Sequence, residues 1–136
     1  MARRTRAPVT TERPRDLLGR PLPADADPSL AVPGITPIGG LSDAQVWAMA
    51  MGYLDEGLPF HAHEVFEARW RTAPQDDRDA WQAHAQWAAA LTHAARGNDV
   101  GAQRLTQRAR DLMRTASSIP ACMDRSIMGD DVPPTR

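Results

Sequence analysis

The stretch FHAHEVFEARWR, residues 60–71, decides how the rest of this chain is organised. Helical spacing places His63, Glu67 and Trp70 on one stripe of a helix, flanked by phenylalanines. A histidine and a carboxylate four residues apart on an aromatic stripe depart from ordinary amphipathic patterning, in which one face is apolar and the other polar. The stretch therefore predicts both a helix and a candidate site.

Terminal signals set the bounds of this helix and of the one before it. The helix that contains the stretch begins at Pro59, a residue tolerated in the first turn, and ends near Ala73, because a proline follows. Ahead of it, Ser42 and Gln45 form a capping-box pattern for a helix that runs to about Gly57. Two consecutive helices are therefore expected from about residue 42 to residue 73.

Two further helices are predicted after this pair. Residues 75–77 give an acidic start to a third helix, which periodicity carries to Arg96. Gly97 stands where a left-handed C-terminal cap belongs, and Asn98 is a good N-cap for a fourth helix that ends near residue 116. A turn this short makes the third and fourth helices antiparallel neighbours. Four arginines are expected on the outward face of the fourth helix: Arg104, Arg108, Arg110 and Arg114.

The predicted fold class is all-α, a small bundle of about four main helices, because no stretch alternates with the period of a strand. We divide the chain into a flexible Pro/Arg-rich extension over residues 1–40, a helical bundle domain over residues 41–119, and a short helical turn with a disordered tail over residues 120–136. A core this small would also gain stability from a homodimer that buries part of an apolar face.

The N-terminal extension allows two interpretations. Seven of the twelve prolines of the chain fall within its forty residues, a composition typical of a solvated tail. Alternatively, residues 13–23, with Leu17 and Leu18 between arginines, form a docking segment for the domain or for a protein partner.

Composition excludes several functional classes. The net charge of −1 argues against nucleic-acid binding, which usually requires a strong basic excess. The single cysteine, Cys122, excludes an intrachain disulfide framework and a thiolate zinc cluster. No apolar run approaches the length of a membrane span, and the N-terminus lacks the apolar segment of a secretory signal. We expect a cytoplasmic protein without membrane contacts.

Several motifs together resemble the domain of unknown function 309 family. They are HEVFE at residues 63–67, Trp70 with Arg71, a glutamine pair at 82 and 86, and RGN at residues 96–98. The resemblance covers about residues 44–116. It implies a small bundle of helices, in agreement with the periodicity, and it implies no reaction, because none is established for the family.

Packing of the second predicted helix against the third would bring six polar or aromatic side chains around one space. These are His63, Glu67, Trp70, Gln82, Gln86 and His93, and neighbouring alanines leave room between them. One interpretation is a pocket for a small polar ligand or ion. Another is a structural network whose members satisfy one another, as buried polar groups usually do. A third is a metal site made by His63, Glu67 and His93.

The sequence also bears on two other functions, hydrolysis and protein–protein interaction, and on the two remaining histidines. No recognisable catalytic motif accompanies these groups, so a metal-dependent or acid–base hydrolase is the least supported function, and no cofactor is identified. The alternative to a ligand pocket is a protein–protein interaction module, because the last two helices resemble a tetratricopeptide hairpin, with the N-terminal extension used for docking. His61 is expected to be exposed, and His84 to lie in the core or at its edge and not to act as a ligand.

Overall fold

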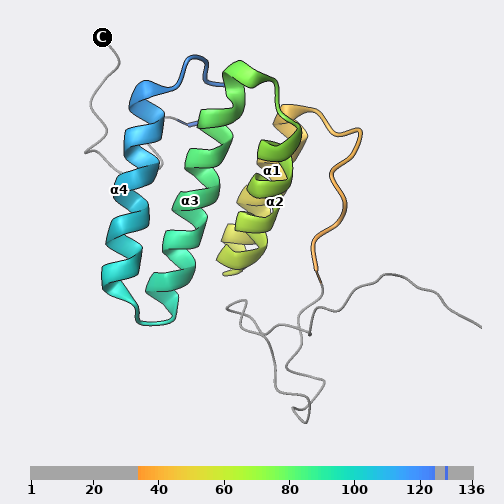
Figure 1. The fold of residues 1–136 in the computed structure, drawn as a ribbon. Coiled ribbons are helices and arrows are strands. Elements are labelled where there is room, and N and C mark those ends of the chain that lie inside the picture. The colour runs from red at the N-terminus through yellow and green to blue at the C-terminus, as the bar shows by residue number, and fades with distance from the viewer. Residues whose placement is uncertain (1–33, 125–127, 129–136) are drawn as a thin grey trace, which may run out of the picture.

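Four helices form a small bundle in the computed structural model, which describes residues 34–124 and Met128 (Figure 1). This part of the chain contains no strand, which confirms the all-α prediction. The extension up to residue 33 and most of the predicted tail lie outside the described residues. The helices are α1 (Asp43–Asp55), α2 (Pro59–Thr72), α3 (Arg78–Ala95) and α4 (Asp99–Thr115), with a 3₁₀ turn, η2 (Gln75–Asp77), before α3.

The predicted end signals of these helices are confirmed. Ser42 accepts a hydrogen bond from the backbone N–H of Gln45, whose side-chain oxygen accepts one from the Ser42 N–H, as a capping box requires. Asn98 Oδ1 accepts from the N–H of Gly101 at 3.0 Å and caps α4. Gly97 adopts a φ of 85° between α3 and α4. Local chemistry therefore sets where these helices start and stop.

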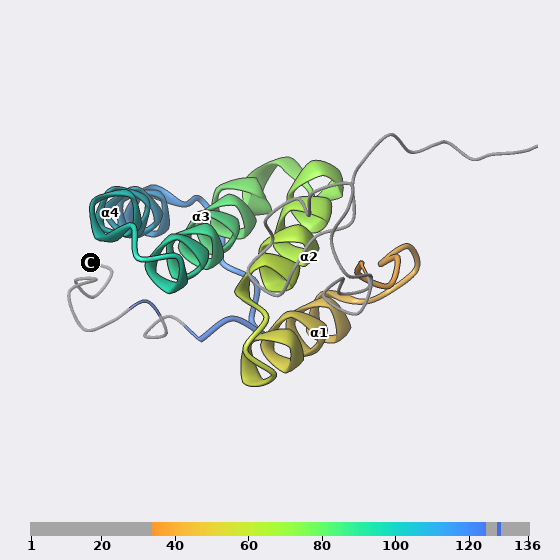
Figure 2. The same cartoon turned by 90° about the horizontal axis from the view of Figure 1, so that it is seen from below.

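The helices α2, α3 and α4 lie side by side in one layer, and α1 packs beside α2 on one face of it (Figure 2). Consecutive helices run in opposite directions because the connections are short. An ion pair fastens α1 to α2, since Arg69 Nη2 lies 2.8 Å from Asp43 Oδ1. Within the described residues, none of the helices combines the length and the apolar composition needed to cross a membrane.

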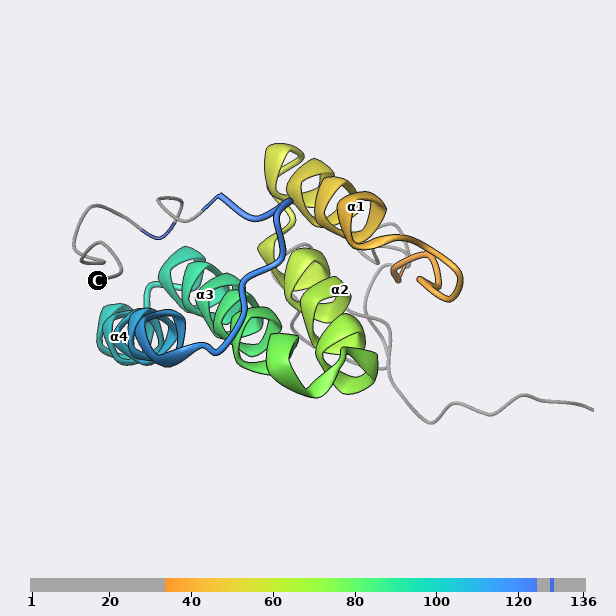
Figure 3. The same cartoon turned by 90° about the horizontal axis from the view of Figure 1, so that it is seen from above.

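After α4 the chain turns back and crosses the face of the layer on which α1 lies (Figure 3). After Pro120 the described residues form a turn, in which the Met123 N–H donates to the Pro120 carbonyl at 3.0 Å. Met123 and Met128 are buried, and Arg110 Nη2 donates to the Met128 carbonyl at 3.0 Å. The outward placement predicted for Arg110 is therefore wrong, because the returning segment covers its side chain.

The centre of the core is an aromatic cluster of four residues, Trp47, Phe66, Trp81 and His84. The His84 ring centre lies 5.0 Å from that of Trp47 on α1 and 5.4 Å from that of Phe66 on α2. Phe66 in turn lies 6.3 Å from Trp81. The cluster thus joins three helices, and the prediction that His84 is a core residue is confirmed.

The prediction that His61 is exposed is wrong. Its side chain is buried, and its ring centre lies 5.3 Å from that of Tyr53 on α1. The reason is the position of α2, which packs against α1 on one side and α3 on another. A helix with two neighbours buries more than the single face that its sequence pattern indicates.

The turn between α3 and α4 yields a test of backbone conformation. Replacing Gly97 with alanine forces a side chain into a left-handed backbone, so we expect a loss of about 1 kcal/mol in the free energy of unfolding, measured by urea denaturation. Gly52→Ala is the matched control, because Gly52 lies inside α1 with open space around the position of a Cβ. It should stabilise the protein by about 0.5–1 kcal/mol. Equal effects of the two substitutions would contradict this account of the turn.

Candidate functional site

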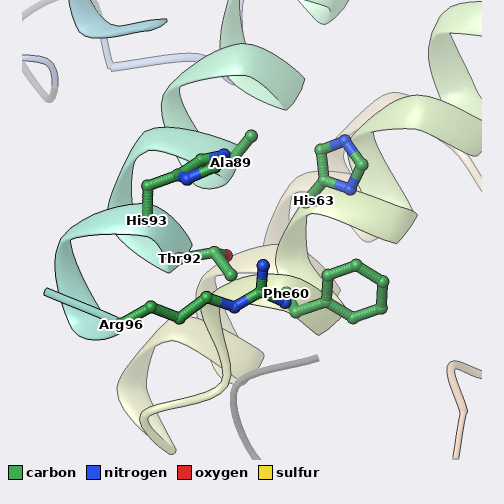
Figure 4. Close-up of a pocket in the computed structure, with 6 residues that line it drawn as sticks. All are labelled: Phe60, His63, Ala89, Thr92, His93 and Arg96. Atoms are coloured by element: carbon green, nitrogen blue, oxygen red, sulfur yellow. The ribbon is translucent and has the colours of Figure 1, made fainter. Parts of the chain in front are cut away.

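A pocket of about 180 Å³ lies between α2 and α3 (Figure 4). The first turns of α2 face the last turns of α3 here because the two helices are antiparallel. Helical spacing explains why these side chains share one place, since members of each set are three or four residues apart. The lining residues are Phe60 and His63 from α2, Ala89, Thr92 and His93 from α3, and Arg96, the C-terminal cap of α3.

His63 is a half-buried imidazole on the α2 side of the pocket. Its Nδ1 is buried and has no hydrogen-bond partner among the described residues. Burial lowers the pKa of His63 below its usual value, Glu67 opposes this effect, and Arg71 adds to it. The ring is therefore mostly uncharged at neutral pH.

His93 stands on the opposite side of the pocket, and its neighbours fix its tautomer (Figure 4). Asn98 Oδ1 already accepts the cap hydrogen bond, so its Nδ2 must be the donor in the 3.0 Å contact with His93 Nδ1. His93 Nδ1 then accepts, and the neutral ring carries its hydrogen on Nε2. Because Asn98 donates to Nδ1, the other ring nitrogen of His93, Nε2, carries the N–H group and can donate a hydrogen bond.

The remaining polar wall comes from Thr92 and Arg96. The Thr92 hydroxyl donates to the Ala88 carbonyl at 3.0 Å, so its hydrogen is already used. Arg96 extends from the end of α3 towards Phe60 on α2 (Figure 4). The pocket wall therefore carries one permanent positive charge, two imidazoles, and no carboxylate among its lining side chains.

Of the six residues predicted for the site, the structure brings His63 and His93 together in this wall, and the other four lie outside it. Glu67 forms an ion pair with Arg71 at 3.3 Å. Trp70 lies beneath the guanidinium of Arg78, whose central carbon is 5.5 Å from the centre of the indole ring. Gln82 is half-buried, and Gln86 has a buried Oε1 without a hydrogen-bond partner in the described part of the chain.

Sequence reasoning did not assign Phe60, Ala89, Thr92 or Arg96 to the site. Their signal was spacing from the two histidines, because Phe60 precedes His63 by three residues and Arg96 follows His93 by three. Arg96 was instead assigned to the turn motif RGN. A search for small residues on facing turns of antiparallel helices would have found Ala89.

Metal binding can be examined from the arrangement of the ligating side chains. Residues 34–124 and Met128 contain no group of three or more His, Cys, Asp or Glu side chains placed to hold one metal ion. The two histidines of the pocket share its wall with Arg96, whose charge disfavours a cation. The composition of the wall thus suits an organic or anionic ligand better than a metal.

A second hollow, of about 460 Å³, lies between residues 38–41 and the end of α2. Its charged lining residues, Arg69 and Arg71, each form an ion pair, with Asp43 and Glu67 respectively. Each charged side chain of this hollow is thus held by an ion pair with a neighbouring carboxylate.

His84 is a fully buried imidazole in the core, and one of its two ring nitrogens forms a hydrogen bond. Its Nδ1–H donates to the Ala80 carbonyl at 2.9 Å, so Nε2 carries the lone pair. Nε2 is buried and finds no hydrogen-bond partner within the described residues. Burial lowers the pKa of His84 from 6.5 to about 4, against smaller opposing effects of Ala80 and Asp124.

Comparison with known proteins adds a family assignment. Residues 47–105 match the model of a family described as Domain of unknown function (DUF309). The matched range runs from α1 into α4 and contains every lining residue of the pocket. No curated protein and no solved structure matches the chain.

The lowered pKa of His84 predicts loss of stability in mild acid. The unfolded chain binds a proton at His84 near pH 6.5 and the folded protein only near pH 4, so this stabilisation is complete above pH 6.5 and is lost as the pH falls towards 4. The loss amounts to about 3 kcal/mol. Denaturation of the wild type and of His84→Leu at several pH values measures it.

The difference between the two proteins isolates His84, because carboxylates and His63 contribute equally to both. We expect the free energy of unfolding of the wild type to fall more steeply between pH 6.5 and 4 than that of His84→Leu. Parallel curves would show that His84 takes up its proton as readily in the folded protein as in the unfolded chain.

Proposed function

We propose that the helical bundle, whose residues 47–105 match the DUF309 family model, is a binding domain for a small polar ligand. The ligand occupies the pocket between α2 and α3. The observation that carries the proposal is the convergence of two imidazoles and a guanidinium on one hollow.

An incompletely satisfied set of polar groups favours a ligand over a purely structural network. Buried polar atoms in folded proteins almost always have a partner, and each exception calls for an explanation. His63 and Gln86, two members of the predicted network, have buried atoms without such a partner in the described chain. The predicted network is therefore incomplete as a purely structural one, although Gln86 lies outside the pocket wall and would not contact a ligand there.

The size of the pocket limits the ligand. Sites for drug-sized molecules have volumes of roughly 300–1,000 Å³. At about 180 Å³, this pocket suits a molecule no larger than a single ring with one polar substituent. A pocket of this size leaves little space for a second molecule beside the ligand.

The lining also favours binding over covalent catalysis. The hydroxyl of Thr92 is tied to the Ala88 carbonyl, and no lining carboxylate is present to activate it. Cys122 lies in the segment after α4, outside the pocket wall, and burial raises the pKa of its thiol, which disfavours the reactive thiolate. With one cysteine and no disulfide framework, we propose that this binding occurs in the cytoplasm.

Filling the pocket tests the proposal. Thermal denaturation of the full chain would be measured with a panel of small carboxylates, amides, amines and phosphate. We expect at least one compound class to raise the melting temperature of the wild type, and Ala89→Leu to abolish that rise, because the added side chain occupies the ligand volume.

Ala94→Leu is the matched control, since Ala94 is exposed on the same helix and does not line the pocket. It should respond to ligands like the wild type. A ligand response that survives in Ala89→Leu would place binding elsewhere, and the absence of any response would remove the proposed function.

A further inference from the structure

We infer that the ligand of this pocket is a small organic anion, a carboxylate attached to a flat apolar group. The inference rests on the proposed function and names the chemical class that the same site selects. Two features carry it, the hydrogen-bond donors of the wall and the apolar surface beside them.

The donors of the wall select a negative charge. Arg96 brings a fixed positive charge and a planar fork of N–H groups that matches the geometry of a carboxylate. His93 contributes an N–H donor at Nε2, because its Nδ1 accepts from Asn98. No lining side chain is an acid that would repel an anion or pair with a cation.

The helix ends do not reverse this preference. The first turn of α2, with its positive end of the helix dipole, has no acidic residue and no side-chain cap. The last turn of α3 brings the negative end of its dipole to the same place. The two dipoles oppose each other, so neither helix end by itself selects the sign of the ligand's charge.

The apolar part of the wall selects a flat group. The Phe60 ring lies at the edge of the pocket, 5.9 Å from the ring of His63 at an interplanar angle of 32°. Ala89, on the facing helix, leaves space opposite these rings because its side chain is a single methyl group. A flat ring can contact such a wall over its face, while the carboxylate reaches Arg96 and His93.

Three molecules of nearly the same shape separate charge from size, namely benzoate, benzamide and benzylamine. Calorimetric titration of the full chain at pH 7 should give the lowest Kd for benzoate. We expect benzamide to bind at least about tenfold more weakly, since it lacks the charge-assisted hydrogen bonds, and benzylamine to show no binding. Inorganic phosphate serves as an anion without the apolar group and should bind more weakly than benzoate.

Arg96→Gln tests the assigned contact. It should raise the Kd for benzoate at least about tenfold and bring it close to that for benzamide, whose own Kd should change little. Arg104→Gln is the matched control, because Arg104 is an exposed arginine on α4 outside the pocket. His93→Gln provides a second variant should Arg96→Gln fold poorly, and should also weaken benzoate binding.

The possible outcomes separate the inference from the proposed function. If benzamide or benzylamine binds as tightly as benzoate and Ala89→Leu abolishes that binding, the pocket binds a ligand and its preference for anions is wrong. If phosphate binds more tightly than benzoate, the apolar part of the inference is wrong. An unchanged Kd for benzoate in Arg96→Gln places the carboxylate away from Arg96 and overturns the inference.

The pH dependence of the affinity gives an independent readout. Glu67 and Arg71, on the same helix, act on the charge of His63, and His93 on α3 and Arg96 at the end of α3 share the pocket wall with it. A bound carboxylate favours the protonated form of His63, so binding should take up a proton, and benzoate affinity should increase as the pH falls from 8 to 5.5. His63→Gln should reduce this increase, and an affinity independent of pH would contradict the placement of the anion beside His63.

Discussion

The packing of the His84 ring between α1 and α2 is the interaction on which the rest of this structure depends. Its Nδ1–H is tied to Ala80 in its own helix, which holds the ring in one orientation. The edge of that ring meets Trp47 at an interplanar angle of 81°, and Phe66 lies on another side of it. Edge-to-face contacts of this kind are favourable and directional, so they fix the relative positions of three helices. The ring remains neutral because burial disfavours its charged form.

The candidate site follows from the same packing of α2 against α3. Phe66 joins the aromatic cluster, while His63, one turn earlier in α2, faces the pocket. At the corresponding level of α3, small alanines replace large aromatic side chains, and the two helices enclose a space that they do not fill. The turn after α3 then adds specificity, since Asn98 caps α4 with its oxygen and fixes the tautomer of His93 with its nitrogen. A local capping residue thus contributes to the chemistry of the pocket.

The fold was predictable in most of its detail, because the ends of a helix are set by residues that lie close to them in sequence. Ser42, Gly97 and Asn98 act within one turn of their own positions, and each does what its chemistry predicts. The candidate site was predictable only in part. His63 and His93, which were expected to share one space, line the same pocket, as do Arg96 and Phe60, which were not assigned to it. Glu67 pairs with Arg71 on its own helix, and intrahelical competition of this kind depends on side-chain geometry that spacing alone does not specify.

The sequence by itself determined the number of helices, their order and their ends, since propensity, capping and hydrophobic period are local properties. Only the tertiary structure decided which faces have two neighbours and which groups share a space. It buried His61 against Tyr53 and brought Arg110 to the carbonyl of Met128, in the segment that follows α4. It also placed Phe60 and Arg96 in one pocket wall. These outcomes depend on the angles and heights at which helices pack, which arise from contacts between residues distant in sequence.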